Sequence, residues 1–413
     1  MSEFKPLSGI NKNMLTSNPP REEFEARLAA LFSTLRRSGH RFDTALIIDR
    51  INQYYFTGTM QDGILVLRRD GEAFFFVRKS YDRALFESPL DIIRPMNSYR
   101  DLLQFLPADL GSTFIETEVM PLAVLERLRK YFTISVIQPL EGITMRLRSV
   151  KSKYELDIMR ESGRQHNYLL QQIIPGLLRA GISEAELQGE VYNSMIQLGY
   201  HGVSRFAMFQ AELIAGQVSF AESGIFPTSF NGPGGGRGAS AAIPTLGSRD
   251  RLLQRGDIIL LDIGYGINGY HTDKTQVYCF GAEPPKEAVE VHQACLDVLN
   301  RASAQLVIGA VPAKVYQNIM AELPAALQAN FMGYGREQVK FLGHSIGLQI
   351  DEQPVIARGF NEPLKPNMAF ALEPKSGIAG IGMVGAEETY LVTPEGPECI
   401  TGGAKEIMVV DYR

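Results

Sequence analysis

The residues with the clearest potential for chemistry are two aspartates that lie eleven positions apart. Asp262 ends the apolar run that begins at residue 257, and Asp273 begins a second β-type run that continues to Phe280. The stretch between them is rich in glycine and asparagine, which is typical of a hairpin turn. A turn centred near Ile267 and Asn268 would place the two aspartates opposite each other, on one face of an antiparallel strand pair.

Two carboxylates held side by side repel each other unless a cation or a shared proton lies between them. Asp262 also ends a strand that we expect to be buried, where an unpaired charge is costly. A hard metal ion that bridges Asp262 and Asp273 is the simplest solution to both problems.

Further candidate ligands follow later in the chain. His344 lies in a turn flanked by glycine, Glu373 ends an apolar run, and Glu387 and Glu388 both precede another strand-like run. Carboxylates and one imidazole suit a pair of divalent ions such as Mn, Fe, Co or Zn. Structural zinc would require cysteine-rich ligands at short spacing, which this sequence lacks. Two such ions generate a bridging hydroxide near neutral pH and polarise a carbonyl group.

The order Asp, Asp, His, Glu, Glu, with its flanking residues, resembles the pita-bread metallopeptidase family. The matching motifs are DIG and TDKT around the aspartates, GHSIGLQ around the histidine, and LEP and EETYLVT around the glutamates. That family includes prolidase, aminopeptidase P, methionine aminopeptidase and the non-metal relative creatinase. The resemblance is strong over the last two-thirds of the chain and weak over the first third.

The resemblance implies that two divalent metal ions are held by Asp262, Asp273, His344, Glu373 and Glu387. The family's register selects Glu387 over the glutamate that follows it. Glu373 would also act as the base toward the bridging water. A small-molecule or dipeptide substrate and a homodimeric protein are further implications of the resemblance.

The sequence departs from the family's peptidases where substrate contacts are expected. Asp351 replaces a histidine that usually follows the GHGIGL motif, and Thr245 replaces a second histidine after an Ala-Ala-x-Pro segment. Gln276 and Gly385 stand where arginines are usual. In the peptidases the two histidines contact the scissile amide and stabilise the tetrahedral intermediate. Their replacement leaves the metal ligands in place but argues against ordinary peptide cleavage.

Four residues are candidates for substrate binding. One is Thr245, and each of the other three has an alternative interpretation. Asp351 should face the metals, where it would repel a substrate carboxylate if ionised or donate a hydrogen bond if protonated. It could instead pair with Arg237, which lies in the glycine-rich segment 232–238. That segment lacks the Lys-Ser/Thr of a P-loop, so we interpret it as a substrate-facing loop in which Arg237 binds a carboxylate or is merely solvated. His271 is either a hydrogen-bond donor close to the metal ligands or an ordinary strand residue.

The elements that position these residues indicate an α/β (α+β) chain of two domains. Residues 1–149 are expected to form a creatinase-like N-terminal α/β domain, with a helix near 19–38 and a hairpin over 64–77. Residues 150–413 are expected to form the pita-bread catalytic domain. Further helices are expected near residues 80–88 and 98–106 in the first domain, and near 152–174, 183–198, 284–305 and 312–328 in the second.

Composition excludes several classes of protein. A chain of 413 residues with 45% hydrophobic and 21% charged residues is typical of a globular protein with two cores. A net charge of −5 argues against a nucleic-acid-binding protein. No apolar run reaches the length of a membrane span, and the N-terminal residues lack the apolar core of a signal peptide. Three widely spaced cysteines favour a cytoplasmic protein in which they serve packing.

Three functions are compatible with these observations. The first is a metal-dependent hydrolase similar to Xaa-Pro dipeptidase or aminopeptidase P, whose bridging hydroxide attacks a substrate carbonyl. The second is a non-peptidase of the same fold, either a creatinase- or ectoine-hydrolase-like C–N hydrolase or a dimethylsulfoniopropionate lyase. The third is a non-catalytic binding module, which the retained set of carboxylate ligands argues against because buried unpaired carboxylates are costly.

Overall fold

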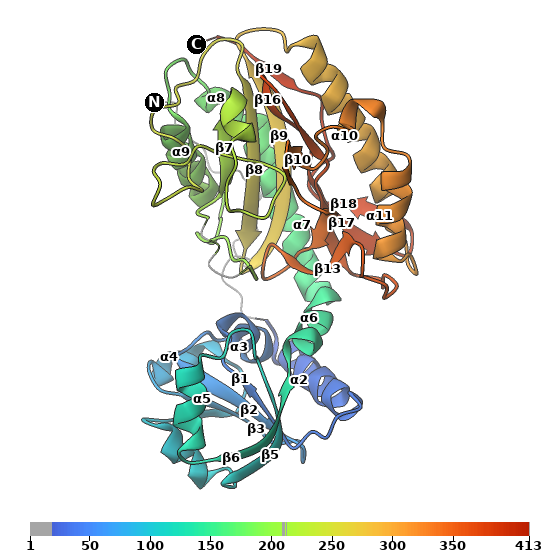
Figure 1. Ribbon diagram of the computed structural model, residues 1–413. Coiled ribbons are helices and arrows are strands. Elements are labelled where there is room, and N and C mark those ends of the chain that lie inside the picture. Colours follow the sequence, from blue (N-terminus) through green and yellow to red (C-terminus); the bar gives the residue numbers. More distant parts are fainter. Residues whose placement is uncertain (1–18, 209–210, 212, 413) are drawn as a thin grey trace. The chain divides into compact units, whose positions relative to one another are not determined.

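The computed structural model describes residues 19–208, 211 and 213–412 of the chain (Figure 1). The first eighteen residues, which we assigned to the N-terminal domain, lie outside the described residues. The chain divides into two compact units, one of which ends at Arg148 while the other begins at Ser149.

The N-terminal unit contains a mixed sheet of six strands in the order β4-β3-β2-β1-β5-β6. Its first helix buries Phe24, Leu28, Leu31 and Leu35 on one face, as the spacing predicts. The predicted hairpin over 64–77 is present as β2 and β3. The strands are β1 (Thr44–Ile47), β2 (Gly63–Arg68), β3 (Ala73–Val77), β4 (Ile93–Pro95), β5 (Asp109–Ile115) and β6 (Thr133–Pro139). The helices are α2 (Arg21–Arg36), α3 (Arg50–Thr57), α4 (Tyr81–Glu87), the 3₁₀ helix η1 (Tyr99–Gln104), α5 (Leu122–Arg129) and α6 (Glu141–Ser149).

The C-terminal unit contains three sheets of four, five and four strands. The first has the order β19-β9-β8-β7, with β7 (Gly216–Phe220), β8 (Ile258–Ile267), β9 (Tyr270–Phe280) and β19 (Met408–Val410). The second has the order β13-β12-β14-β17-β18, with β12 (Phe341–Ser345), β13 (Glu352–Ala357), β14 (Ala369–Leu372), β17 (Glu388–Thr393) and β18 (Gly396–Cys399). The third has the order β11-β10-β15-β16, with β10 (Gly333–Tyr334), β11 (Glu337–Gln338), β15 (Lys375–Ile378) and β16 (Gly382–Gly385).

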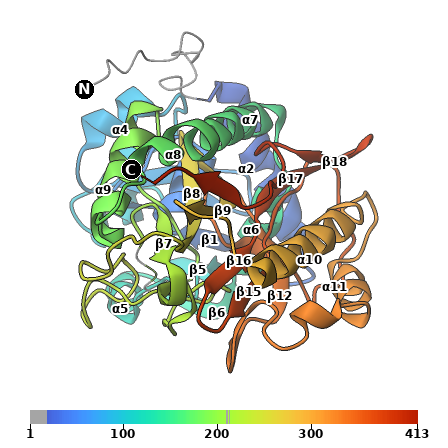
Figure 2. The same ribbon diagram turned by 90° about the horizontal axis from the view of Figure 1, so that it is seen from above.

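Helices cover the outer faces of these sheets. Helix α7 (Lys153–Tyr168) packs on β8 and β9, whereas α10 (Lys286–Ser303) packs on β14, β15 and β16, so that the strands lie between the two helices (Figure 2). A capping box of Ser152 and Glu155 begins α7. The remaining helical segments are the π turn η2 (Leu169–Ile173), α8 (Ile174–Leu177), α9 (Glu184–Gln197), the 3₁₀ turn η3 (Ala221–Ile225), α11 (Pro312–Ala321) and the 3₁₀ turn η4 (Ala325–Leu327).

Two of the expected helices differ from what the sequence indicates. The helix expected near 152–174 is present, but the π turn η2 interrupts its α-helical geometry between α7 and α8, where Pro175 has no N–H to donate to a regular α-helical hydrogen bond. Helix α11 ends at Ala321 rather than near residue 328, because Pro324 disfavours helical geometry in the residue before it. Among the described residues, no helix combines the length and the apolarity that a membrane span requires.

The hairpin of β8 and β9 differs in register from the prediction. Its turn is formed by Asn268 and Gly269, at φ values of 47° and 90°, which is the left-handed geometry that an Asn-Gly pair favours. Asp262 therefore lies opposite Thr275 rather than opposite Asp273. Side chains alternate along a strand, so this shift of two residues leaves both aspartates on one face.

Candidate metal centre

The structure brings together all five ligand candidates that the sequence predicts. Their ligand atoms form two overlapping groups, and within each group all of these atoms lie within 4.8 Å of one another. The first group, called the histidine group below, consists of Asp273, His344 and Glu387. The second, called the carboxylate group, consists of Asp262, Glu373 and Glu387.

Strand pairing explains why residues so far apart in sequence meet. Strand β14 lies between β12 and β17, with Ala371 opposite His344 and Leu372 opposite Glu388. The ends of β14 and β17 therefore bring Glu373 and Glu387 to the histidine. An isolated bridge between Glu387 and Thr275 connects these strands to β9, which carries Asp273.

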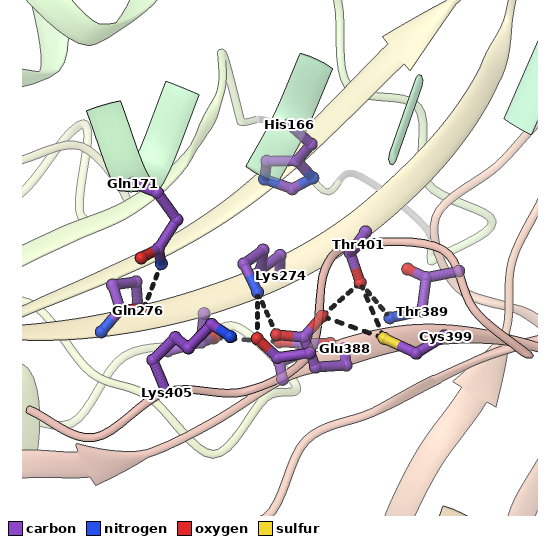
Figure 3. Close-up of polar contacts among 12 residues, drawn as sticks. His166, Gln171, Lys274, Gln276, Glu388, Thr389, Cys399, Thr401 and Lys405 are labelled. Atoms are coloured by element: carbon purple, nitrogen blue, oxygen red, sulfur yellow. Dashed lines mark hydrogen bonds and ion pairs between the residues drawn. The ribbon is translucent and has the colours of Figure 1, made fainter. Parts of the chain in front are cut away.

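The structure separates the roles of Glu387 and its neighbour Glu388. Glu387 belongs to both groups, whereas Glu388 belongs to neither. The Glu388 carboxylate accepts hydrogen bonds from the Lys274 ammonium and the Thr401 hydroxyl, and Cys399 Sγ lies 3.4 Å away (Figure 3). The Lys274 and Glu388 side chains are both fully buried. This geometry favours Glu387 as the ligand, in agreement with the register of the motif.

A lysine that sequence reasoning missed occupies the carboxylate group. Lys375 Nζ lies 2.8 Å from Asp262 Oδ2, 2.9 Å from Glu373 Oε2 and 2.6 Å from Glu387 Oε2. Its side chain has no exposed surface. Burial alone would lower the pKa of Lys375, but the three carboxylates outweigh burial and raise that pKa well above its usual value.

In the histidine group, Lys375 contacts only Glu387, and no described lysine or arginine side chain forms an ion pair with Asp273. Glu387 Oε1 is buried without a hydrogen-bond partner among the described residues, and it lies 4.0 Å from His344 Nε2. Burial raises the pKa of Asp273 well above its usual value, and the charge of Asp262 raises it further. Burial and the charge of Asp273 do the same to the pKa of Glu387. Such a set of carboxylate and imidazole donors, with an orphaned oxygen, fits one divalent cation.

A cavity of about 330 Å³ opens onto this centre. Asp351 faces it, as predicted, and its carboxylate accepts hydrogen bonds from the backbone amides of Ala207 and Met208. Burial raises the pKa of Asp351 although these two amides act against the shift. Apolar and aromatic residues form much of the remaining wall, namely Phe206, Met208, Leu213, Phe230, Phe341, Ile350 and Val355.

The other substrate-binding candidates do not line this cavity. Arg237 is exposed, and its guanidinium lies 5.9 Å from the ring centroid of Phe226, so the alternative pairing with Asp351 is wrong. Gly238, at φ 76°, lies against Pro244, and a Cβ added there would lie 2.6 Å from Pro244 Cα. Thr245 is likewise absent from the cavity wall.

The glycine-rich segment nevertheless contributes to the cavity at its beginning. Gly232 belongs to the wall, as does Asn231 directly before the segment. His271 is fully buried behind the wall, with Nδ1 3.0 Å from Gly347 O and Nε2 3.2 Å from His201 Nε2. Burial lowers the pKa of His271 to about 4, which favours the neutral imidazole.

A two-unit α/β protein whose second unit gathers carboxylates and a histidine between curved sheets has the pita-bread architecture. Residues 157–394 match the model of metallopeptidase family M24, and residues 27–150 match that of the creatinase/prolidase N-terminal domain. The chain belongs to metallopeptidase family M24. The family and the fold predicted from the sequence are therefore confirmed.

Similar proteins are peptidases by name. The chain is 25% identical over 376 residues to an uncharacterized peptidase of Staphylococcus aureus, covering 87% of this chain and 94% of that protein. It is 23% identical over 368 residues to a Xaa-Pro dipeptidase of Pyrococcus furiosus, covering 89% of this chain and 95% of that protein.

Solved structures agree with this fold. The prolidase from Pyrococcus horikoshii OT3 superposes with a TM-score of 0.75 at 19% identity, over 93% of this chain and 100% of that one. The X-Pro aminopeptidase from Thermotoga maritima superposes with a TM-score of 0.72 at 22% identity, over 93% of this chain and 99% of that one. At these identities the likeness concerns the fold.

Proposed function

We propose that this chain is a metal-dependent hydrolase that cleaves a C–N bond in a small substrate bearing an amine, and that it is not an ordinary Xaa-Pro dipeptidase. The observation that carries the proposal is the charge of the cavity. Four carboxylates of the centre and Asp351 line it, whereas none of its described lining residues is an arginine or a lysine. A substrate carboxylate would therefore meet repulsion rather than a binding partner.

The aromatic part of the cavity wall would favour a cationic group on the substrate. The rings of Phe206 and Phe230 both face the cavity and pack edge to face, with centroids 5.5 Å apart. Aromatic rings next to a carboxylate are a favourable environment for an ammonium group. Asp351 is held in place by two backbone amides, so its orientation does not depend on the substrate.

The roles of the chain's own residues in hydrolysis follow from this arrangement. A divalent ion held by Asp273, His344 and Glu387 would polarise the carbonyl and acidify a bound water. Water adds to the carbonyl carbon, and the carboxylate of Glu373 takes its proton. The C–N bond then breaks as this proton passes to the leaving nitrogen. Lys375 orients Glu373 for this role through its hydrogen bond to Oε2.

A matched set of dipeptides tests the proposed substrate class. The protein is loaded with Mn²⁺ and given an Xaa-Pro dipeptide as the free acid, the same dipeptide as its C-terminal amide, and the N-acetylated amide. We expect the amide with a free amine to have a kcat/KM at least about tenfold higher than either other form, which corresponds to about 1.4 kcal/mol. Faster hydrolysis of the free acid would contradict the proposal and support the second candidate, an Xaa-Pro dipeptidase, which the name of the Pyrococcus furiosus relative favours.

Replacing Asp351 by asparagine tests the contact with the amine. The variant keeps one acceptor oxygen for the backbone amides but loses the negative charge. A hydrogen bond to a charged group contributes about 1.5–3 kcal/mol, so KM for the amine-bearing substrate should rise roughly 10- to 100-fold. The N-acetylated substrate serves as the control and should show a much smaller change. Equal changes in KM for both substrates would mean that Asp351 has only a structural role.

A further inference from the structure

We infer that Lys375 permanently occupies one of the two cation positions of this centre, so that the chain binds a single divalent ion where two would otherwise bind. The inference rests on the proposed metal at the histidine group and adds that the carboxylate group takes no metal. It departs from the pair of ions that the sequence motifs imply.

The contacts of Lys375 coincide with a complete ligand group. Its ammonium reaches one oxygen each of Asp262, Glu373 and Glu387, and these are all the members of the carboxylate group. An ammonium has three protons to donate, and here each has its own carboxylate acceptor. A divalent ion bound by the same three oxygens would have to occupy the space that Nζ fills.

The surroundings of Lys375 are also closely packed. Its side chain is fully buried, and its backbone carbonyl accepts a hydrogen bond of 2.8 Å from Met332 N. Strand pairing places Lys375 opposite Gly385, and the φ angle of Gly385 is 137°. A Cβ added to Gly385 would lie 2.6 Å from Lys375 Cα and 3.1 Å from its Cβ. The glycine at position 385 is therefore required for the position that the lysine takes.

Glu387 can serve the ammonium and a metal ion at the same time. Lys375 contacts its Oε2 atom, whereas Oε1 has no hydrogen-bond partner among the described residues and lies 4.0 Å from His344 Nε2. Asp273 belongs to the histidine group but not to the carboxylate group that Lys375 contacts. The ammonium therefore fills the carboxylate group and leaves the donors of the histidine group available.

Metal stoichiometry tests this inference directly. Metal-free protein is titrated with Mn²⁺ by calorimetry, and the bound metal is then measured by elemental analysis. The wild type should saturate at one ion per chain, with the electron paramagnetic resonance spectrum of an isolated Mn²⁺. Lys375→Ala removes the ammonium and leaves three carboxylates around an open space. This variant should bind two ions per chain and show an exchange-coupled pair.

Two further variants make the result specific. Lys375→Gln should also gain the second ion, though more weakly, and it replaces the alanine variant if that one does not fold. The control is the double variant Lys274→Met/Glu388→Met, which removes another buried lysine together with its partner. It should keep the wild-type value of one ion.

The outcomes separate this inference from the proposed function. A wild type that binds two ions would overturn the inference while leaving the proposed hydrolase intact. Variants at Lys375 that fold and stay at one ion would also overturn it. A wild type that binds no ion would overturn the metal-dependent function and this inference with it.

Discussion

Replacing His344 by alanine is expected to weaken the binding of a divalent ion more than about 100-fold. Loss of a partner that merely orients a metal ligand typically costs about 10- to 100-fold in metal affinity, and loss of the ligand itself should cost more. His344 is the only imidazole among the ligand candidates of the described residues, and its Nε2 atom lies close to both Glu373 and Glu387. Calorimetric titration with Mn²⁺ measures the effect without requiring a known substrate.

The matched control for this prediction is His292→Ala. His292 is also buried in the C-terminal unit, but its two ring nitrogens contact backbone atoms of Lys405 and Gly385. This variant should keep its affinity for the ion, provided that circular dichroism shows a native fold. Unchanged Mn²⁺ affinity in His344→Ala would remove the histidine from the metal centre.

Replacing Lys274 by methionine should destabilise the C-terminal unit by about 3–5 kcal/mol, which is the usual cost of breaking a buried ion pair from one side. The variant leaves the Glu388 carboxylate fully buried without its counter-ion. The hydroxyl of Thr401 remains as a donor, but a hydroxyl does not compensate for a missing charge. Urea denaturation followed by circular dichroism measures the free energy of unfolding.

The double variant Lys274→Met/Glu388→Met distinguishes this mechanism from a simple packing defect. Replacing both members of a buried ion pair by apolar residues of similar volume is often close to neutral. The double variant should therefore recover most of the stability lost in the single variant. If it is as unstable as Lys274→Met alone, the loss comes from packing rather than from the unpaired carboxylate.

The sequence predicts this site well in the strands, where successive side chains point to alternate faces. Period-two alternation placed Asp262 and Asp273 on one face although their register was shifted, because moving the turn by one residue moves the pairing by two. The same alternation separates Glu387 from Glu388, since neighbouring strand residues point to opposite faces. These local rules do not depend on the rest of the fold.

Residues outside regular strands could not be placed in this way. Arg237 and Thr245 lie in a glycine-rich loop whose course depends on a close backbone approach at Gly238, which no periodicity reveals. Lys375 was missed because a lysine after Glu-Pro is usually solvated. Strand alternation gives no signal for it either, because Glu373 and Pro374 lie between β14 and β15, which belong to different sheets.

The buried ammonium of Lys375 has a consequence for how this centre responds to its surroundings. A cation that is part of the polypeptide is not subject to mass action, so a chelator cannot extract it. Copper, which outcompetes most first-row metals for nitrogen and oxygen ligands, has no ion to displace at that position. The polypeptide itself thus supplies part of the positive charge beside Glu373 and Glu387, and only the rest has to come from a metal ion taken up from the cell.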